Sequence, residues 1–360
     1  MRHLHFETIA PICPRCRIDR SIDSALVIAN IITEEGDQIV EGILHCSDES
    51  CQIEYPIIDG IPILVPDIRT FITDQWPQLN ARKDLSATMR SLLADGAGSD
   101  SALEITRQHL STYAWDHYSQ FDPDEPQASL SPGSIARCLS EGLKLFDAGV
   151  SGPAIDLGCS TGRTTFELAA STNDLVLGID LSFPMLQLAG VVLRNGIVQY
   201  ERRTGGLVYE PRSFSVEFPG SDRVDFWLCD AMSLPFRDAG FGLGVGLNLL
   251  DSVVSPIGLL QTLDRIIKPS GQVLLSCPYD WSTTATPVEA WIGGHSQRGG
   301  HGGSSETLLR SLLTPGGHPQ SLENMEIIRE AERVPWQIRT HDRCLVKYDL
   351  HLIAARSTKA

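Results

Sequence analysis

Short apolar runs alternate with helical patterns through the second half and the C-terminal part of the chain. The runs that predict strands are Pro153–Leu157, Leu175–Ile179, Phe226–Cys229, Phe241–Leu247, Gln272–Cys277, Met325–Glu332 and Leu345–Ala354. Apolar positions at helical spacing instead mark Arg163–Ser171, Pro256–Ile267 and Glu306–Leu313. Because strands alternate with helices, we expect an α/β domain over residues 131–360, with a mostly parallel sheet of seven strands and an antiparallel final pair.

The N-terminal part has a different pattern. Ser24–Ile32 and Gln38–Leu44 predict short strands on either side of a turn at residues 34–37, within a small domain over residues 1–66. Residues 67–130 predict a helical connector, with helical spacing at Leu85–Leu93 and Ala102–Tyr118. The connector contains an aromatic cluster of Tyr113, Trp115, His117 and Tyr118, for which a lid over the following domain and ordinary packing both stay open.

Charge and hydropathy narrow the function class. The 360 residues carry a net charge of −16, and residues 1–66 hold 11 acids against 4 Lys or Arg. Nucleic-acid binders usually show a basic stripe, so this balance favours a small-molecule or protein substrate. The sequence has no apolar run long enough to span a membrane and no signal-peptide pattern, and a cytoplasmic location is the default expectation.

Four of the nine cysteines form two close pairs, Cys13/Cys16 and Cys46/Cys51. Two such pairs on separate turns can present four thiolates to Zn²⁺, and a small domain of this size is marginal without such a staple. The pattern therefore predicts a zinc ribbon with a structural Zn²⁺. Two disulfides or free thiols remain alternatives, as do His5 and His45 as substitute ligands.

The segment after the second pair carries Tyr55, Pro56, Asp59, Gly60, Ile61 and Pro62. It resembles the small zinc-ribbon proteins that activate tRNA and release-factor methyltransferases, where the ribbon is a separate polypeptide. The resemblance implies either a role in substrate or partner-protein binding or simple packing on the catalytic domain.

A glycine-rich turn follows the first strand of the larger domain, with the pattern Asp156-x-Gly158-x-x-x-Gly162. Gly158 permits a tight turn, and Gly162 lets the next helix begin close to a ligand. Asp180 lies 18 residues after Gly162, at the end of the second strand, where an acid can accept hydrogen bonds from ribose hydroxyls. Asp230 and Ala231 follow the third strand.

Taken in order, these three elements resemble the class I methyltransferases, which have a Rossmann-like fold and use S-adenosyl-L-methionine. The resemblance places Asp156 near the methionine end of the cofactor and Asp230 near the adenine amine. The cofactor-binding residues it implies are Asp156, Gly158, Cys159, Ser160, Gly162, Asp180, Leu181, Asp230, Ala231 and Asn248.

The segment past the fourth strand bears on the methyl acceptor. It reads Asn248-Leu249-Leu250-Asp251, and later come Pro278-Tyr279-Asp280-Trp281 and Trp291-Ile292-Gly293-Gly294. Together these resemble the histidine ring-nitrogen methyltransferases that act on 4-mercaptohistidine (in ovothiol synthesis), carnosine or protein histidine. The resemblance implies that the catalytic residues are Asn248, Asp251 and Tyr279, with the first two holding an imidazole and Tyr279 lining its pocket.

The sequence also departs from that family. Ser252 stands where the relatives often carry Arg, the N-terminal ribbon is additional, and the Gly-rich loop at residues 293–305 has its own His295, Arg298 and His301. The prediction is therefore methylation of a thiohistidine, histidine or carnosine type of small molecule. An rRNA or tRNA base methyltransferase that binds RNA through the ribbon, a protein-histidine methyltransferase, and a non-catalytic activating module are the alternatives.

Overall fold

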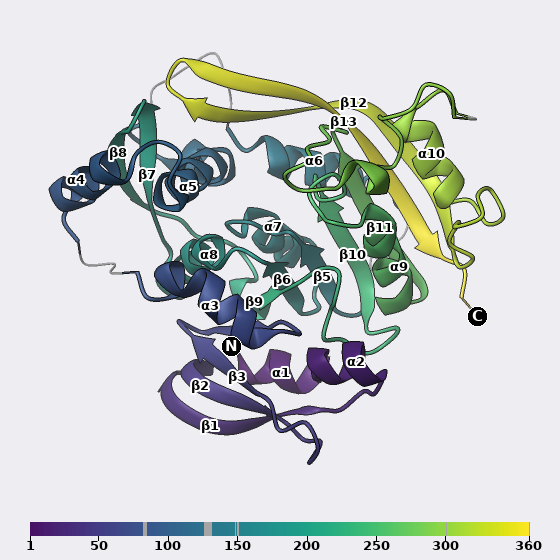
Figure 1. Cartoon of the computed structure of the whole chain (residues 1–360), viewed down its shortest axis with the longest axis horizontal. Helices are drawn as coiled ribbons and strands as arrows, with labels where there is room; N and C mark the ends of the chain where they lie inside the picture. The colour runs from purple at the N-terminus through teal and green to yellow at the C-terminus, as the bar shows by residue number, and fades with distance from the viewer. Residues whose placement is uncertain (82–84, 126–131, 148, 150, 300, 360) are drawn as a thin grey trace.

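The computed structural model describes residues 1–81, 85–125, 132–147, 149, 151–299 and 301–359 (Figure 1). The predicted boundary between residues 130 and 131 lies outside this part of the chain. No helix among the described residues is long and apolar enough to cross a membrane.

Helices and strands alternate through the second half of the chain, as the hydrophobic pattern predicts. The helices are α1 (His3–Ile9), α2 (Pro14–Arg20), α3 (Ile68–Leu79), α4 (Ala87–Ala97), α5 (Ala102–Tyr118), α6 (Ser134–Leu143), α7 (Arg163–Ser171), α8 (Phe183–Asn195), α9 (Pro256–Ile266) and α10 (Ser305–Leu312). The strands are β1 (Leu26–Glu35), β2 (Gln38–Cys46), β3 (Glu54–Ile58), β4 (Ile61–Leu64), β5 (Ala154–Leu157), β6 (Val176–Asp180), β7 (Ile197–Gly205), β8 (Val208–Ser215), β9 (Val224–Cys229), β10 (Phe241–Leu247), β11 (Ile267–Cys277), β12 (Met325–His341) and β13 (Cys344–Ser357).

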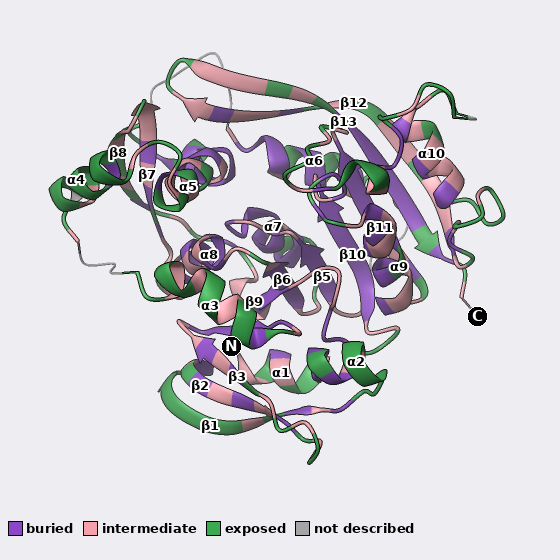
Figure 2. Ribbon diagram, in the orientation of Figure 1, coloured by how far each residue is buried: buried purple, intermediate pink, exposed green. Residues whose placement is uncertain are grey.

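One large mixed sheet organises the molecule, in the order β1-β2-β3-β4-β9-β6-β5-β10-β11-β13-β12. Strands β9, β6, β5, β10 and β11 are parallel neighbours, and β13 is antiparallel to both β11 and β12. The strands at the seven positions expected from the sequence are neighbours in this sheet, from β9 to β12 in the order given above. The central ones are buried along their whole length, as in a parallel sheet covered on both faces (Figure 2).

The sheet has eleven strands rather than the seven expected, because the N-terminal strands extend it. Strand β4 pairs in parallel with β9 through Ile63↔Leu228 and Leu64↔Cys229. Strands β1, β2 and β3 then continue as an antiparallel meander beyond β4. The lobe that carries the first four cysteines therefore shares a continuous backbone ladder with the larger domain.

Two further features shape the upper part of the molecule in Figure 1. Strands β7 and β8 form a separate hairpin that contacts α5, and the long hairpin β12–β13 reaches across toward it. An ion pair of 2.8 Å between Arg202 on β7 and Asp342 at the tip of β12–β13 joins the two. The final pair of strands is longer than the sequence predicts, since residues 333–344 continue the hairpin.

Candidate active site

A cavity of about 420 Å³ opens at the carboxyl ends of β5, β6, β9 and β10. This volume is in the range that holds a small organic ligand, and the edge of the sheet is where open α/β folds bind theirs. Every cofactor residue that the sequence predicts, apart from Gly162, lines the cavity. The residues come from four strand ends because parallel strands present their carboxyl ends at one edge.

The glycine turn between β5 and α7 has a backbone that only glycine adopts easily. Gly158 has a φ of 69° and Gly162 a φ of 91°, both in the left-handed region. A Cβ atom on Gly162 would lie 2.6 Å from Cζ of Phe226, and one on Gly158 would lie 2.8 Å from Cδ1 of Leu249. Gly162 therefore acts behind the cavity wall, by letting α7 start against β9.

Asp156 is buried at the end of β5 and supports this turn from below. Its Oδ2 accepts hydrogen bonds from the hydroxyls of Thr164 (2.6 Å) and Thr165 (2.7 Å) in the first turn of α7. Burial raises the pKa of Asp156 to about 6, against the lowering effect of these two hydroxyls. The carboxylate therefore ties strand, turn and helix together beside the cavity.

Asp180 and Asp230 end the second and third strands of the domain. The two carboxylate oxygens of Asp180 accept backbone N–H groups from Ser160 and Ser182, both at 2.8 Å. Burial raises the pKa of Asp180, while these N–H groups oppose the rise. Asp230 accepts the N–H of Met232 at 2.9 Å. Each oxygen keeps a second lone pair, so both acids can still accept a hydrogen bond from a ligand.

Helix α5 covers the cavity, and His109, Tyr113 and His117 on it line the wall. The helix is fastened to the glycine turn, because the Tyr118 hydroxyl donates to the carbonyl of Thr161 at 2.5 Å. At the start of α7, the N–H of Arg163 donates to Nδ1 of His117 at 3.3 Å, and its guanidinium donates to the carbonyl of His117 at 2.6 Å.

These contacts fix the state of His117. Burial, together with the charge of Arg163, lowers its pKa to about 3, so the ring is neutral at physiological pH. Since Nδ1 accepts a hydrogen bond, the single ring proton lies on Nε2. For the aromatic cluster in this helix the sequence leaves open a lid and ordinary packing, and Tyr113 and His117 of the cluster line the cavity. Trp115, however, turns away from the cavity and donates to Glu125 at 2.9 Å.

Asn248 lies just past β10 with a φ of 54°, a left-handed backbone conformation that residues other than glycine rarely adopt. Its Oδ1 accepts the hydroxyl of Ser276 at 2.7 Å, and its own N–H donates to the same hydroxyl at 2.9 Å. Its Nδ2 is buried and has no hydrogen-bond partner. A buried amide donor without a partner is costly unless a ligand accepts from it, so Asn248 marks a ligand-binding position.

Asp251 and Tyr279 are not among the residues that line the cavity. Asp251 is buried and accepts the N–H of Asp280 at 2.8 Å, and burial raises its pKa to about 6. The Tyr279 hydroxyl contacts Nδ1 of His351 at 2.6 Å, and Nε2 of that histidine contacts Glu330 at 2.9 Å. The structure thus brings Asn248 into the cavity, whereas Asp251 and Tyr279 form hydrogen bonds with residues outside the lining.

Ser252 and Trp336 also line the cavity, and neither is among the site residues predicted from the sequence. The indole N–H of Trp336 donates to Asp116 at 3.0 Å, and its ring stacks on Tyr348 with centroids 5.0 Å apart. Trp336 reaches the cavity only because β12 runs beside α5, a neighbourhood that no local pattern encodes.

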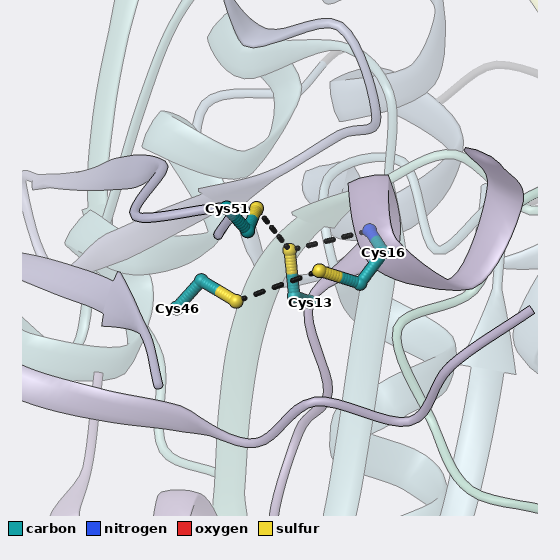
Figure 3. Close-up of side chains that lie close together, drawn as sticks. All are labelled: Cys13, Cys16, Cys46 and Cys51. Atoms are coloured by element: carbon teal, nitrogen blue, oxygen red, sulfur yellow. Dashed lines mark hydrogen bonds between the residues drawn. The ribbon is translucent and has the colours of Figure 1, made fainter. Parts of the chain in front are cut away.

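The four paired cysteines of the N-terminal lobe converge at a second site (Figure 3). Their sulfur atoms all lie within 4.8 Å of one another, with Cys13 to Cys51 at 3.9 Å and Cys16 to Cys46 at 3.6 Å. Four sulfurs on a tetrahedral zinc with bonds of about 2.3 Å are separated by about 3.8 Å. The donor set and its spacing therefore fit Zn²⁺. His5 lies elsewhere, with its Nε2 against the carbonyl of Arg223 at 3.0 Å.

Comparison with known proteins adds to this geometry. Residues 155–275 match the family model described as "Methyltransferase domain". A curated relative, 27-O-demethylrifamycin SV methyltransferase of Amycolatopsis mediterranei, is 24% identical over 121 residues, which are 34% of this chain and 36% of that protein. The match thus spans about a third of the relative's length.

Solved structures also match at low identity. A methyltransferase of Methanosarcina mazei is 21% identical, with a TM-score of 0.40, over 64% of this chain and 98% of that one. Phosphoethanolamine N-methyltransferase 2 of Haemonchus contortus, in complex with phosphomonomethylethanolamine and S-adenosylhomocysteine, is 19% identical, with a TM-score of 0.36, over 50% and 34% of the two chains. The family match places a class I, S-adenosylmethionine-dependent methyltransferase domain at residues 155–275 of this chain.

Proposed function

We propose that this protein is an S-adenosylmethionine-dependent methyltransferase and that it transfers the methyl group to a ring nitrogen of an imidazole in a small, histidine-like molecule. The observation that carries the proposal is the end of β10, where Asn248 offers a buried, unpartnered amide to the cavity. Asp251, three residues later, is buried and its charge acts on Tyr113 in the cavity wall. The same segment carries the resemblance to histidine ring-nitrogen methyltransferases.

The bound cofactor supplies a methyl group on a sulfonium, and the protein has to align a lone pair with it. A neutral imidazole has one bare nitrogen and one N–H. The bare nitrogen forms the new N–C bond while the C–S bond breaks, so no base has to act first. The ring becomes a cation, and its N–H proton then leaves to solvent.

The residues near Asn248 suit this change of charge. The charge of Asp251 reaches the cavity, since Tyr113, which lines it, has a pKa raised by burial and by the charges of Asp180, Asp251 and Asp116. The same field would stabilise a cationic ring. Asn248 orients a ligand acceptor through Nδ2. In this proposal Asp251 is a positioning residue whose charge reaches the ring, rather than a residue that takes a proton.

The test is a labelled-methyl assay with histidine, 4-mercaptohistidine, carnosine, a histidine-containing protein and RNA as acceptors. Transfer to small imidazoles, with loss of transfer in Asn248→Ala, supports the proposal. Absence of transfer to every small imidazole would refute it, and salt-sensitive transfer to RNA would assign the base-methyltransferase function instead. Ser276→Ala is the matched variant, since it leaves the Asn248 amide in place but frees its orientation.

The cysteine cluster supports a second proposal, that Cys13, Cys16, Cys46 and Cys51 hold one structural Zn²⁺ as thiolates. The fit of the four sulfurs to a tetrahedron supports it. Metal analysis of the purified protein should give one zinc per chain. A value near zero in protein purified without chelator, with all four thiols free to react, would contradict it.

A further inference from the structure

The charge of the active-site wall carries an inference about which acceptors the enzyme uses. Among the described residues that line the cavity there is no Lys and no Arg. The wall does contain the carboxylates of Asp156, Asp180 and Asp230. The cavity is therefore acidic. Because these three acids are assigned to the cofactor, the charge that a methyl acceptor meets comes mainly from the acids behind the wall, and a ligand carboxylate would meet no Lys or Arg in the lining.

The acceptor end adds further acids behind the wall. Tyr113, from α5, has its pKa raised by burial and then by the charges of three carboxylates, which come from β6, the turn after β10, and α5 itself. Tyr348 has its pKa raised to about 12 by burial and by Asp280, to which its hydroxyl donates at 3.0 Å. Two hydroxyls from different elements thus lie in the same negative field.

Two cations outside the lining are already paired. Arg163 donates to Glu167 at 2.7 Å and to the carbonyl of His117. Arg310, whose charge acts on Tyr279, pairs with Glu330 at 2.8 Å and also with Glu332. Neither guanidinium lines the cavity, and the charge of Arg163, which reaches His117 in the wall, is itself paired with Glu167.

Aromatic faces lie in the same wall. Trp336 lines the cavity and is held in place by its stack on Tyr348 and its hydrogen bond to Asp116. Tyr113 and His117 pack edge to face, with centroids 6.4 Å apart. Aromatic faces near acids favour a cation, through attraction to the ring and to the carboxylates together.

We propose that the acceptor pocket selects imidazoles whose side chain bears an ammonium group, and that it disfavours those whose side chain bears a carboxylate. This inference rests on the proposed function and narrows its substrate class. It predicts that affinity falls in the order amine, zwitterion, carboxylate among imidazoles of matched shape.

Ser252 is the position at which this selection can be changed. It is exposed, lines the cavity beside Asn248 and belongs to the turn after β10. Ser252→Arg places a cation in the wall without removing any core side chain. Ser252→Gln is the matched control, since it adds a long polar side chain of similar reach but no charge.

The experiment measures binding and turnover with two pairs of probes. Histamine and imidazolepropionate differ only in ammonium against carboxylate, and phenethylamine and phenylpropionate repeat the difference without the imidazole. Each is titrated calorimetrically into protein loaded with S-adenosylhomocysteine, and the imidazole pair is also assayed for labelled-methyl transfer by kcat/KM. We expect a preference for the amine of about ten-fold or more in wild type, reversed or erased in Ser252→Arg and kept in Ser252→Gln.

The outcomes separate the two proposals. If the amine binds more tightly in both pairs but no imidazole receives a methyl group, the proposed function fails and the charge selection stands. If imidazolepropionate binds or reacts as well as histamine in wild type, the charge selection is wrong whatever the methyl acceptor. Equal effects of Ser252→Arg and Ser252→Gln on the amine-to-carboxylate ratio would also overturn it.

Discussion

Replacement of Asp251 by asparagine tests two effects of its buried charge separately, the loss of stability and the contribution to methyl transfer. The carboxylate is 4% exposed, accepts the N–H of Asp280 and has a pKa raised from 3.8 to about 6. The folded protein therefore holds the proton of Asp251 more tightly than the unfolded chain does. Stability from this group is complete below about pH 4 and is lost as the pH rises through about 6.

The size of the effect follows from the pKa difference. At about 1.4 kcal/mol per pH unit, keeping Asp251 ionised in the fold at neutral pH costs about 3 kcal/mol. At about pH 4.5 the folded protein binds the proton, and the remaining cost is about 1 kcal/mol. The asparagine introduced in Asp251→Asn retains an oxygen for the N–H of Asp280 and carries no charge. The stability of Asp251→Asn relative to wild type should therefore improve by about 2 kcal/mol when the pH is raised from about 4.5 to neutral.

The assay is urea unfolding of both proteins at about pH 4.5 and about pH 7.5, with wild-type m-values as the check on two-state behaviour. Titrations shared by the two proteins cancel in the difference. Glu323→Gln, at an exposed position, should change by less than about 0.5 kcal/mol between the two pH values. Methyl transfer by Asp251→Asn should fall at the same time, because the field that stabilises the cationic ring is gone. A relative stability that does not change with pH would refute the reasoning.

Three further variants test other parts of the structure. Gly162→Ala should destabilise the fold by about 2–5 kcal/mol in urea unfolding, because the backbone there is left-handed and the new Cβ would clash with Phe226. Gly205→Ala is the control, and it should cost under about 1 kcal/mol because the space around Gly205 is open. Equal costs of the two variants would contradict the argument. Tyr118→Phe should weaken the binding of S-adenosylhomocysteine several-fold in calorimetry, because losing the hydrogen bond from Tyr118 to the glycine turn costs about 1 kcal/mol. An unchanged affinity would show that other contacts hold α5 in place. Cys46→Ser should lower the zinc content and the unfolding temperature together, and a variant that keeps full stability without metal would count against a structural ion.

Local pattern predicts the elements of this fold well where apolar spacing and breakers coincide. Helices Ala102–Tyr118 and Arg163–Ser171 and strand Phe241–Leu247 begin and end at the predicted residues. Each helix starts at a clear signal: Ser101 caps α5, and Gly162 starts α7. The lining residues that follow strand ends, such as Asp180, Asp230 and Asn248, were predictable in position because the apolar runs define those strand ends.

Long-range pairing was not predictable in this way. Strand β4 is only four residues long, and nothing in Ile61–Leu64 indicates that it pairs with β9 rather than closing the ribbon on itself. The position of the Asp251 carboxylate outside the cavity lining also depends on a long-range contact. Asp251 is adjacent in sequence to a lining residue, but the turn of the backbone directs its carboxylate to Asp280. Sequence distance from the site therefore does not determine contact with it.

The pairing of β4 with β9 also determines what the larger domain would be without the N-terminal lobe. Strand β9 is buried at every position, and β4 supplies its outer neighbour. Cutting the chain after residue 66 would leave β9 as a bare edge with unpaired N–H and C=O groups along an apolar strand, which is the kind of edge that recruits other chains. The lobe thus covers part of an edge of the central sheet that would otherwise be open to other chains, and both belong to one polypeptide.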